Sequence, residues 1–142
     1  MSEIEDDQTM SSKPNNKRVN SAKDLDVYRF AYDLAMAIFE LSKRFPPEEK
    51  FALTTQIRRS SRSVCLNLRE AWAKRRYQAH FVSKLTDSDG ENSETDSSLD
   101  FAKDCRYTSA GEHQRWQPNA QTSGACLDKM LKTSQSFLIT ER

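Results

Sequence analysis

The 142-residue chain is long enough for one domain with a modest core and too short for two of ordinary size. Its 22 basic and 21 acidic residues nearly balance, so the net charge of +1 does not by itself indicate a nucleic-acid or membrane-surface protein. No apolar run approaches the roughly 20 residues of a membrane span, we expect no signal peptide, and three cysteines without paired spacing favour reduced thiols in the cytoplasm.

The first 23 residues are polar, carry both signs of charge and lack a hydrophobic period. This composition predicts a disordered N-terminal tail over residues 1–23, followed by one domain over residues 24–142. A solvated leader and a segment that folds on binding both remain open as interpretations of the tail.

A first helix is predicted over residues 25–44, with Asp24 as its N-cap. Apolar residues recur there at alternating spacings of four and three, which is typical of a helix packed in a bundle. The seam consists of Val27, Ala31, Leu34, Ile38, Leu41 and Phe45. Pro46 and Pro47 should end this helix, because proline has no backbone N–H to donate.

A second helix is predicted over residues 51–76, with two different faces. At about 100° per residue, one face gathers an apolar stripe. It comprises Leu53, Ile57, Ser60, Ser61, Val64, Leu68, Ala71 and Trp72. The other face gathers Arg58, Arg62, Arg69 and Arg76, at spacings of 4, 7 and 7. One face requires a core, and the other requires solvent, carboxylates or phosphates.

A third helix over residues 80–104 follows a short turn and has an apolar seam with a small, polar middle. That seam is Phe81, Leu85, Ser88, Asn92, Thr95, Leu99 and Ala102. Gly90 weakens this helix by about 1 kcal/mol relative to alanine, so packing rather than propensity should hold it.

A fourth helix over residues 111–137 should open at the capping box of Ser109 and Glu112 and be broken near Pro118, with its main segment from about Thr122 to Phe137. Four amphipathic segments with short connections, and no segment of strand period, predict an all-α protein. The expected fold is an antiparallel up-down-up-down four-helix bundle.

Three stretches together resemble the 23S rRNA intervening-sequence proteins. They are residues 24–53, the run LTTQIRRSSRSVCLNLREAWAKRRY from Leu53 to Tyr77, and FVSKLTDSDGENSET from Phe81 to Thr95. The resemblance implies a left-handed bundle that assembles as a ring-like homopentamer, and it carries no catalytic motif. The family it resembles is related to the accessory variability protein of diversity-generating retroelements. That relationship implies nucleic-acid binding. The segment with Gln117, Pro118 and Gly124 departs from the pattern, as expected of a diverged copy.

The basic face of the second helix is the candidate site. Residues 58–76 carry seven basic residues against one acid, whereas residues 84–104 carry seven acids against two lysines. Arginine suits phosphate because its planar fork donates two parallel hydrogen bonds. The candidate nucleic-acid-binding residues are Arg58, Arg62, Arg69, Lys74, Arg75 and Arg76. Two other interpretations stay open, namely pairing with the acids of the third helix or with acids of a neighbouring subunit.

The remaining chemistry favours packing over catalysis. Trp72 is expected in the core or at a subunit interface, Tyr77 and His80 are expected to pack at a helix end, and Trp116 has no assigned role. Cys65 lies beside the basic face, which would lower its pKa, but no histidine is near it in the sequence. We expect no enzyme, no cofactor, no metal and no small-molecule substrate.

The sequence therefore predicts a cytoplasmic homo-oligomer, as a pentamer, that binds structured RNA or other nucleic acid with low sequence specificity. The alternatives are a protein–protein scaffold without nucleic-acid binding and a diverged copy of uncertain role.

Overall fold

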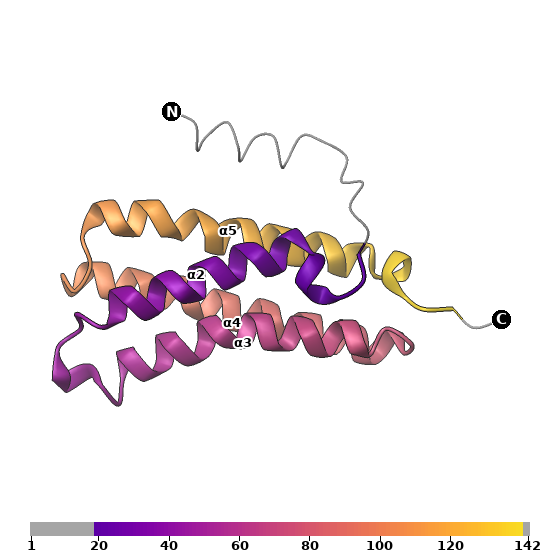
Figure 1. The fold of residues 1–142 in the computed structure, drawn as a ribbon, viewed down its shortest axis with the longest axis horizontal. Coiled ribbons are helices and arrows are strands. Elements are labelled where there is room, and N and C mark those ends of the chain that lie inside the picture. The colour runs from indigo at the N-terminus through magenta and orange to yellow at the C-terminus, as the bar shows by residue number, and fades with distance from the viewer. Residues whose placement is uncertain (1–18, 141–142) are drawn as a thin grey trace.

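A computed structural model of the chain describes residues 19–140. Within that range the chain forms four long α-helices joined by short connections, with no strand (Figure 1). The long helices are α2 (Asp26–Ser42), α3 (Leu53–Ala73), α4 (Gln78–Asp104) and α5 (Ala110–Lys132), and three short 3-10 helices are η1 (Ala22–Asp24), η2 (Pro47–Glu49) and η3 (Ser134–Phe137). The prediction of an all-α four-helix bundle is confirmed.

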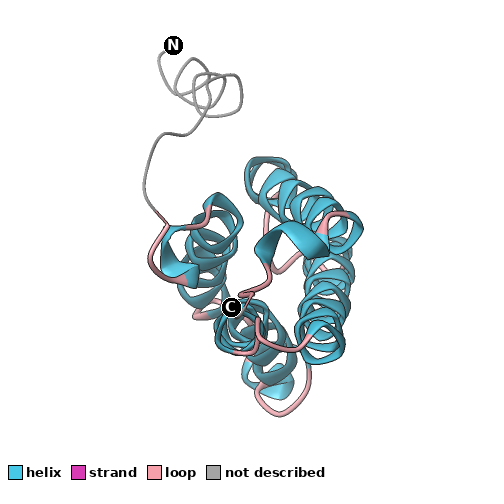
Figure 2. Cartoon of the chain, turned by 90° about the vertical axis from the view of Figure 1, so that its right-hand side faces the viewer, coloured by secondary structure: helices cyan, strands magenta, loops and turns pink. Residues whose placement is uncertain are grey.

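Each long helix packs against two others, so the bundle closes on itself. Successive helices run in opposite directions (Figure 1), and α2 lies against α3, α3 against α4, α4 against α5 and α5 against α2. Viewed along the bundle, the helices surround one shared interior (Figure 2). The bundle therefore has four helix–helix grooves on its outside, and the one between α2 and α3 becomes important below.

A short helix precedes the predicted start of the first long helix. Ser21, rather than Asp24, is the N-cap: its hydroxyl accepts a hydrogen bond from the backbone of Lys23, and the Asp24 carboxylate accepts from the Ser21 backbone N–H in return. These contacts open η1, and α2 follows without a side-chain cap at Leu25. The capping box predicted at Ser109 and Glu112 is confirmed at the start of α5. The first 18 residues of the predicted tail lie outside the described residues.

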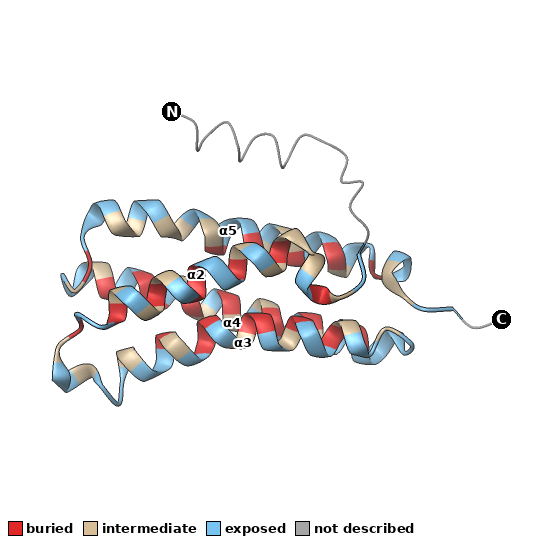
Figure 3. Ribbon diagram, viewed as in Figure 1, coloured by how far each residue is buried: buried red, intermediate tan, exposed pale blue. Residues whose placement is uncertain are grey.

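Buried residues occur along all four long helices (Figure 3), and the apolar ones form two clusters. One cluster is built around Phe81, Leu68 and Leu127, and the other around Leu34, Ile38 and Ile57. Small polar side chains lie fully or almost fully buried along the same helices. They are Ser60, Ser61, Ser88, Asn92, Thr95, Ser98 and Ser123.

Hydrogen bonds compensate most of this polar burial. Ser88 donates to the carbonyl oxygen of Val64 at 2.8 Å, and Asn92 donates to that of Ala120 at 2.9 Å. Each bond joins two different helices. Since buried polar groups are costly unless paired, these bonds fix how the helices align along the bundle. The small polar middle predicted for the third helix is thus part of the interior.

Three of the helices end earlier than predicted on the C-terminal side. Helix α2 ends at Ser42, two residues before the predicted end, and α3 ends at Ala73, three residues before it. Helix α5 ends at Lys132, after which the predicted helix continues only as η3 to Phe137. In each case the last turn departs from α-helical geometry, which apolar periodicity does not report.

The predicted break at Pro118 is wrong, because α5 runs through it without interruption. Pro118 is exposed, whereas Ala120 and Ser123 on the same helix are buried. Asn119 also donates to the carbonyl oxygen of Phe30 on α2, at 3.1 Å. Contacts with the rest of the bundle therefore hold the helix on both sides of the proline and outweigh its local cost.

Candidate nucleic-acid interface

Arginine side chains leave α3 on two sides, and only one side meets the acids of α4. Arg59 forms ion pairs with Glu91 at 3.2 Å and Glu94 at 2.9 Å. Lys84 on α4 pairs with Glu70 on α3 at 2.8 Å. These pairs lie along the outer edge between the two helices. Arg59 was not among the candidate site residues, so pairing with α4 involves a different arginine from those predicted.

Arg58 and Arg62 turn instead toward α2. The Arg58 Nε donates to the hydroxyl oxygen of Ser42 at 2.7 Å, and its guanidinium lies 5.1 Å from the centre of the Phe39 ring. The Arg62 guanidinium lies 5.9 Å from the same ring. Neither forms an ion pair with a carboxylate within residues 19–140. Phe39 thus positions two cations at the surface without neutralising them.

Arg69 continues this row near Tyr28 of α2. Burial raises the pKa of the Tyr28 hydroxyl, and the nearby Cys65 thiol adds to the shift, while the Arg69 guanidinium opposes it. Tyr28 is partly buried, whereas Arg69 is exposed. Arg69 also forms no ion pair among the described residues. Arg58, Arg62 and Arg69 therefore share the α2 side of α3.

The three basic residues at the end of α3 do not act as one cluster. Lys74 and Arg76 are exposed. Arg75 folds back: its Nε donates to the carbonyl oxygen of Trp72 at 2.8 Å and its guanidinium lies 3.8 Å from the centre of the Trp72 ring. Burial accordingly lowers the pKa of Arg75. The Arg75 side chain therefore packs on Trp72, whereas Lys74 is exposed to solvent.

Trp72 belongs to the packed end of the bundle, as predicted. Its ring meets Phe137 of η3 edge-on, with centroids 6.5 Å apart, and Arg75 covers it. The Trp72 Nε1 is buried and has no hydrogen-bond partner within the described part of the chain. Tyr77 and His80 are both exposed, and their ring centroids lie 5.5 Å apart. Trp116, unassigned from the sequence, packs against the apolar cluster that contains Ile57.

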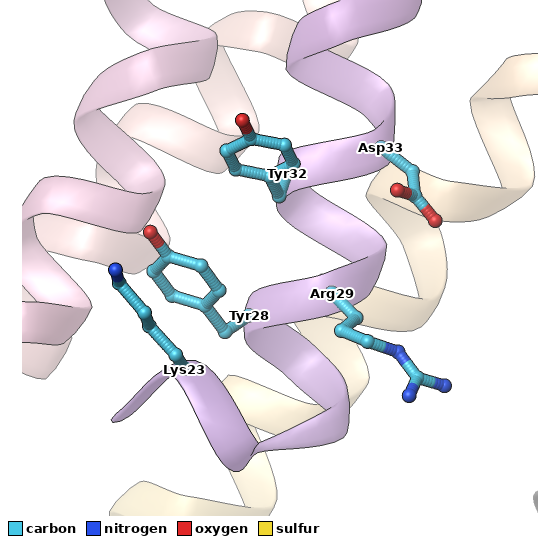
Figure 4. A pocket seen from close by; sticks show the side chains of 5 residues that line it. All are labelled: Lys23, Tyr28, Arg29, Tyr32 and Asp33. Carbon is cyan, nitrogen blue, oxygen red and sulfur yellow. The ribbon is translucent and has the colours of Figure 1, made fainter. Parts of the chain in front are cut away.

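A groove runs between α2 and α3 beside the arginine row, and we call it the α2–α3 groove. Its walls come from one face of each helix. The residues that define it are Tyr28, Tyr32 and Met36 of α2, and Arg58, Arg62 and Leu66 of α3. The central hollow has a volume of about 280 Å³, and its neighbour along α3 about 370 Å³. Figure 4 shows an adjoining hollow, lined by residues of η1 and α2, where Lys23 lies beside Tyr28.

Most of this groove was not predicted from the sequence. No site role was expected for Tyr28, Tyr32, Met36 or Leu66. The signal that indicates them is the spacing of four residues from Tyr28 through Tyr32 to Met36, which continues an apolar row beyond the width that the core requires. Leu66 faces this row from α3, and a single sequence does not report that juxtaposition.

The predicted effect on Cys65 is wrong. Burial raises the pKa of the Cys65 thiol to about 12, and the Asp33 carboxylate adds to the shift. The thiol lies under the α2–α3 groove, 3.9 Å from the carbonyl oxygen of Tyr28, instead of beside exposed arginines. A thiol that keeps its proton is a poor nucleophile. Cys105 is exposed and Cys126 is partly buried, and both are free thiols.

The other ionisable groups form ordinary surface pairs. His113 lies 2.7 Å from Asp100, rather than pairing with its sequence neighbour Glu112, whose carboxylate pairs with Arg44. No three histidine, cysteine or acidic side chains among residues 19–140 are arranged to hold a metal ion. None of the helices in that range combines the length and apolar composition needed to cross a bilayer.

Comparison with known proteins agrees with the fold and the resemblance. Residues 23–129 match the family described as 23S rRNA-intervening sequence protein, a description that names no catalytic activity. A solved structure from Bacteroides thetaiotaomicron, described as a protein with unknown function from the S23 ribosomal protein family, superimposes with a TM-score of 0.68. The two are 26% identical, over 75% of this chain and 95% of the other. None of the curated proteins matches the chain.

Proposed function

The chain belongs to the 23S rRNA-intervening sequence protein family, and from this premise we propose that it binds RNA or another nucleic acid, without catalysis, through the arginine row of α3. The observation that carries the proposal is the direction of Arg58, Arg62 and Arg69. Arg58 and Arg62 line the α2–α3 groove, Arg69 lies near Tyr28, and within the described residues none of the three pairs with a carboxylate. Arg76, predicted with them, is exposed in the turn after α3.

Positioning by neutral groups supports phosphate binding in particular. Ser42 and Phe39 hold Arg58 without removing its charge, so its remaining N–H groups stay available to a phosphate. A cation that is already held loses less conformational entropy on binding. Phosphate contacts carry no base identity, so we propose low sequence specificity.

The test is the salt dependence of RNA binding, measured by gel retardation with a structured RNA. Each neutralised phosphate contributes about −0.7 to −0.9 to the slope of log affinity against log salt. Four arginines therefore predict a slope near −2.8 to −3.6. The combined variant Arg58→Gln, Arg62→Gln, Arg69→Gln and Arg76→Gln should bind more weakly and with a flatter slope.

A matched control neutralises four cations that already have acidic partners. Lys43, Arg44, Lys84 and Lys132 pair with Glu40, Glu112, Glu70 and Asp128, respectively. Replacing them by glutamine gives the same formal net charge, since each set lowers the value of +1 by four. The control should keep most of the wild-type slope. An equal loss in both variants would indicate a response to net charge alone and contradict the site, and no shift of the wild type at low salt would end the nucleic-acid proposal.

We also propose assembly with further copies of the chain, as a pentamer. Phe51 is 87% exposed at the turn before α3, and a second copy would remove it from water. Light scattering should give a mass near five times the 16.4 kDa of one chain. A stable monomer at micromolar concentration would contradict assembly.

Protein scaffolding without nucleic acid is the second candidate. It is favoured by the opposite charges of the acids on α4 and the arginines on the α2 side of α3, which would then pair between copies in a head-to-tail ring. In that case the four-arginine variant would lose mass in light scattering and would have no RNA affinity to lose. The two candidates are thus separated by running both measurements on the same variant.

A further inference from the structure

The α2–α3 groove contains more than cations, and its other side chains restrict what can bind there. Tyr28, Tyr32 and Met36 stand one helical turn apart on α2, at a pitch of about 5.4 Å. Leu66 and Arg62 face them from α3. A site for phosphate alone would not require aromatic and apolar walls. The combination of aromatic rings and arginines is typical of surfaces that bind single-stranded nucleic acid.

The two tyrosines form a preformed stacking surface. Their ring centroids are 6.1 Å apart and their planes differ by 21°. Tyr28 is partly buried and supports Tyr32, which is 50% exposed. Figure 4 shows both rings projecting from one side of α2, away from Arg29 and Asp33. Because the two rings are already in contact, stacking another ring on Tyr32 costs little side-chain conformational entropy.

The apolar walls are exposed where they meet the tyrosines. Met36 is 47% exposed and Leu66 is 62% exposed, on opposite sides of the groove. The hollow between them, at about 280 Å³, is close to the roughly 300 Å³ at which small-molecule sites begin. The groove therefore has the size and the apolar surface for one planar ring system.

The charges around the groove select an anionic occupant. Two cations that line the groove, Arg58 and Arg62, pair with no carboxylate within residues 19–140, and Lys23 lies near its η1 end. Arg59 also lines the hollow along α3, but Glu91 and Glu94 neutralise its charge. A planar apolar ring joined to a phosphate satisfies both features, whereas an acidic peptide would leave the stacking surface unused.

We infer that the α2–α3 groove binds an unpaired RNA nucleotide, with its base stacked on Tyr32 and its phosphate held by Arg62. This inference rests on the proposed function and adds that the preferred substrate is a single-stranded segment. A base inside a duplex is stacked between its neighbours and cannot reach Tyr32. Sequence tolerance follows, since every base offers a flat aromatic face.

The experiment compares a 12-nucleotide single-stranded RNA with a 12-base-pair RNA duplex, using fluorescence anisotropy on the full chain. The test variant is Tyr32→Ala. The matched control is Phe101→Ala, which removes an aromatic side chain of similar exposure, 63%, from the acidic helix α4. Both positions are exposed, so both variants should fold, and circular dichroism checks this.

Tyr32→Ala should weaken single-strand binding by at least about fivefold, the lower end of one base–aromatic stack. Duplex binding and the salt slope should change little, because the arginines remain. Phe101→Ala should change neither RNA. Equal loss for both RNAs, or no loss for the single strand, would overturn the nucleotide site while leaving the proposed function standing. If the wild type binds neither RNA at low salt, the proposed function itself fails and the inference falls with it.

A second measurement locates the base directly. Single-stranded RNA carrying 5-iodouridine should form a photo-crosslink to Tyr32 or Tyr28, identified by mass spectrometry of the digested protein. A crosslink confined to residues outside the groove would overturn the inference. So would a fall in mass on light scattering of Tyr32→Ala that accompanies its loss of binding, since the groove would then be a contact between copies of the chain.

Discussion

The Thr95 hydroxyl donates a hydrogen bond to the hydroxyl oxygen of Ser60 at 2.8 Å, across the contact between α4 and α3, and both side chains are fully buried. The Thr95 oxygen also lies 2.9 Å from the carbonyl oxygen of Glu91 one turn earlier. A polar contact in this position stabilises the bundle only while both partners are present, because an unpaired buried hydroxyl is costly.

The free energy of unfolding lost when both partners are removed should therefore be smaller than the sum of the losses when each is removed alone. We expect Thr95→Val and Ser60→Ala each to lower the free energy of unfolding by about 1 to 2 kcal/mol. The double variant should lose less than the sum of the two. Urea denaturation of the four proteins measures this coupling. Additivity within about 0.3 to 0.5 kcal/mol would show that the two hydroxyls act independently.

Two glycines in helices should respond differently to alanine. A Cβ at Gly90 would meet no atom within 4 Å, so Gly90→Ala should raise the free energy of unfolding by about 1 kcal/mol. A Cβ at Gly124 would lie 3.3 Å from the Nδ2 of Asn92, which is bonded to Ala120. Gly124→Ala should raise the free energy of unfolding by less than Gly90→Ala does, or should lower it. Thermal denaturation of both variants checks the order, and a larger gain at Gly124 would contradict the packing described.

The proline inside α5 should be a local cost that the bundle tolerates. Pro118 is exposed and its ring prevents one backbone hydrogen bond. We expect Pro118→Ala to raise the free energy of unfolding, by up to about 3 kcal/mol. The melting temperature should rise by several degrees, while the helical circular dichroism signal stays almost unchanged. A large increase in that signal would mean that α5 is interrupted in solution.

The cysteines should differ in reactivity. At pH 8 and without denaturant, Cys105 should react quickly with a thiol reagent and Cys65 very slowly, because Cys65 is buried and its pKa is raised to about 12. When the protein is unfolded in guanidinium, Cys65 and Cys105 should react at similar rates. Rapid native labelling of Cys65, identified by peptide mapping, would show that the α2–α3 contact opens readily.

The same shift predicts how alkali affects stability. The folded-state pKa of Cys65, about 12, is raised above the ordinary value of 9.0, so its stabilising contribution is complete below pH 9. That contribution is lost as the pH rises from about 9 to about 12. A Cys65→Ala variant should lack this part of the alkaline loss, which urea denaturation at pH 8 and pH 10 would reveal.

The sequence by itself determined the fold class and most of the interior. The seam predicted from Phe81 to Ala102 is buried at every position, and so is the stripe from Ile57 to Ala71. Apolar periodicity is local and directly reflects which side of a helix leaves water, so it can be read from one chain. The capping box at Ser109 was equally local.

Tertiary structure alone decided how neighbouring faces meet. Arg58 and Arg59 are adjacent in sequence, yet Arg58 contacts Ser42 on α2 and Arg59 pairs with Glu91 on α4. The continuity of α5 through Pro118 likewise depends on contacts from other helices. Consecutive residues on a helix point about 100° apart, so which neighbour each meets depends on the rotation and alignment of the packed helices. Those are set by the whole interior, including bonds such as that from Asn92 to Ala120.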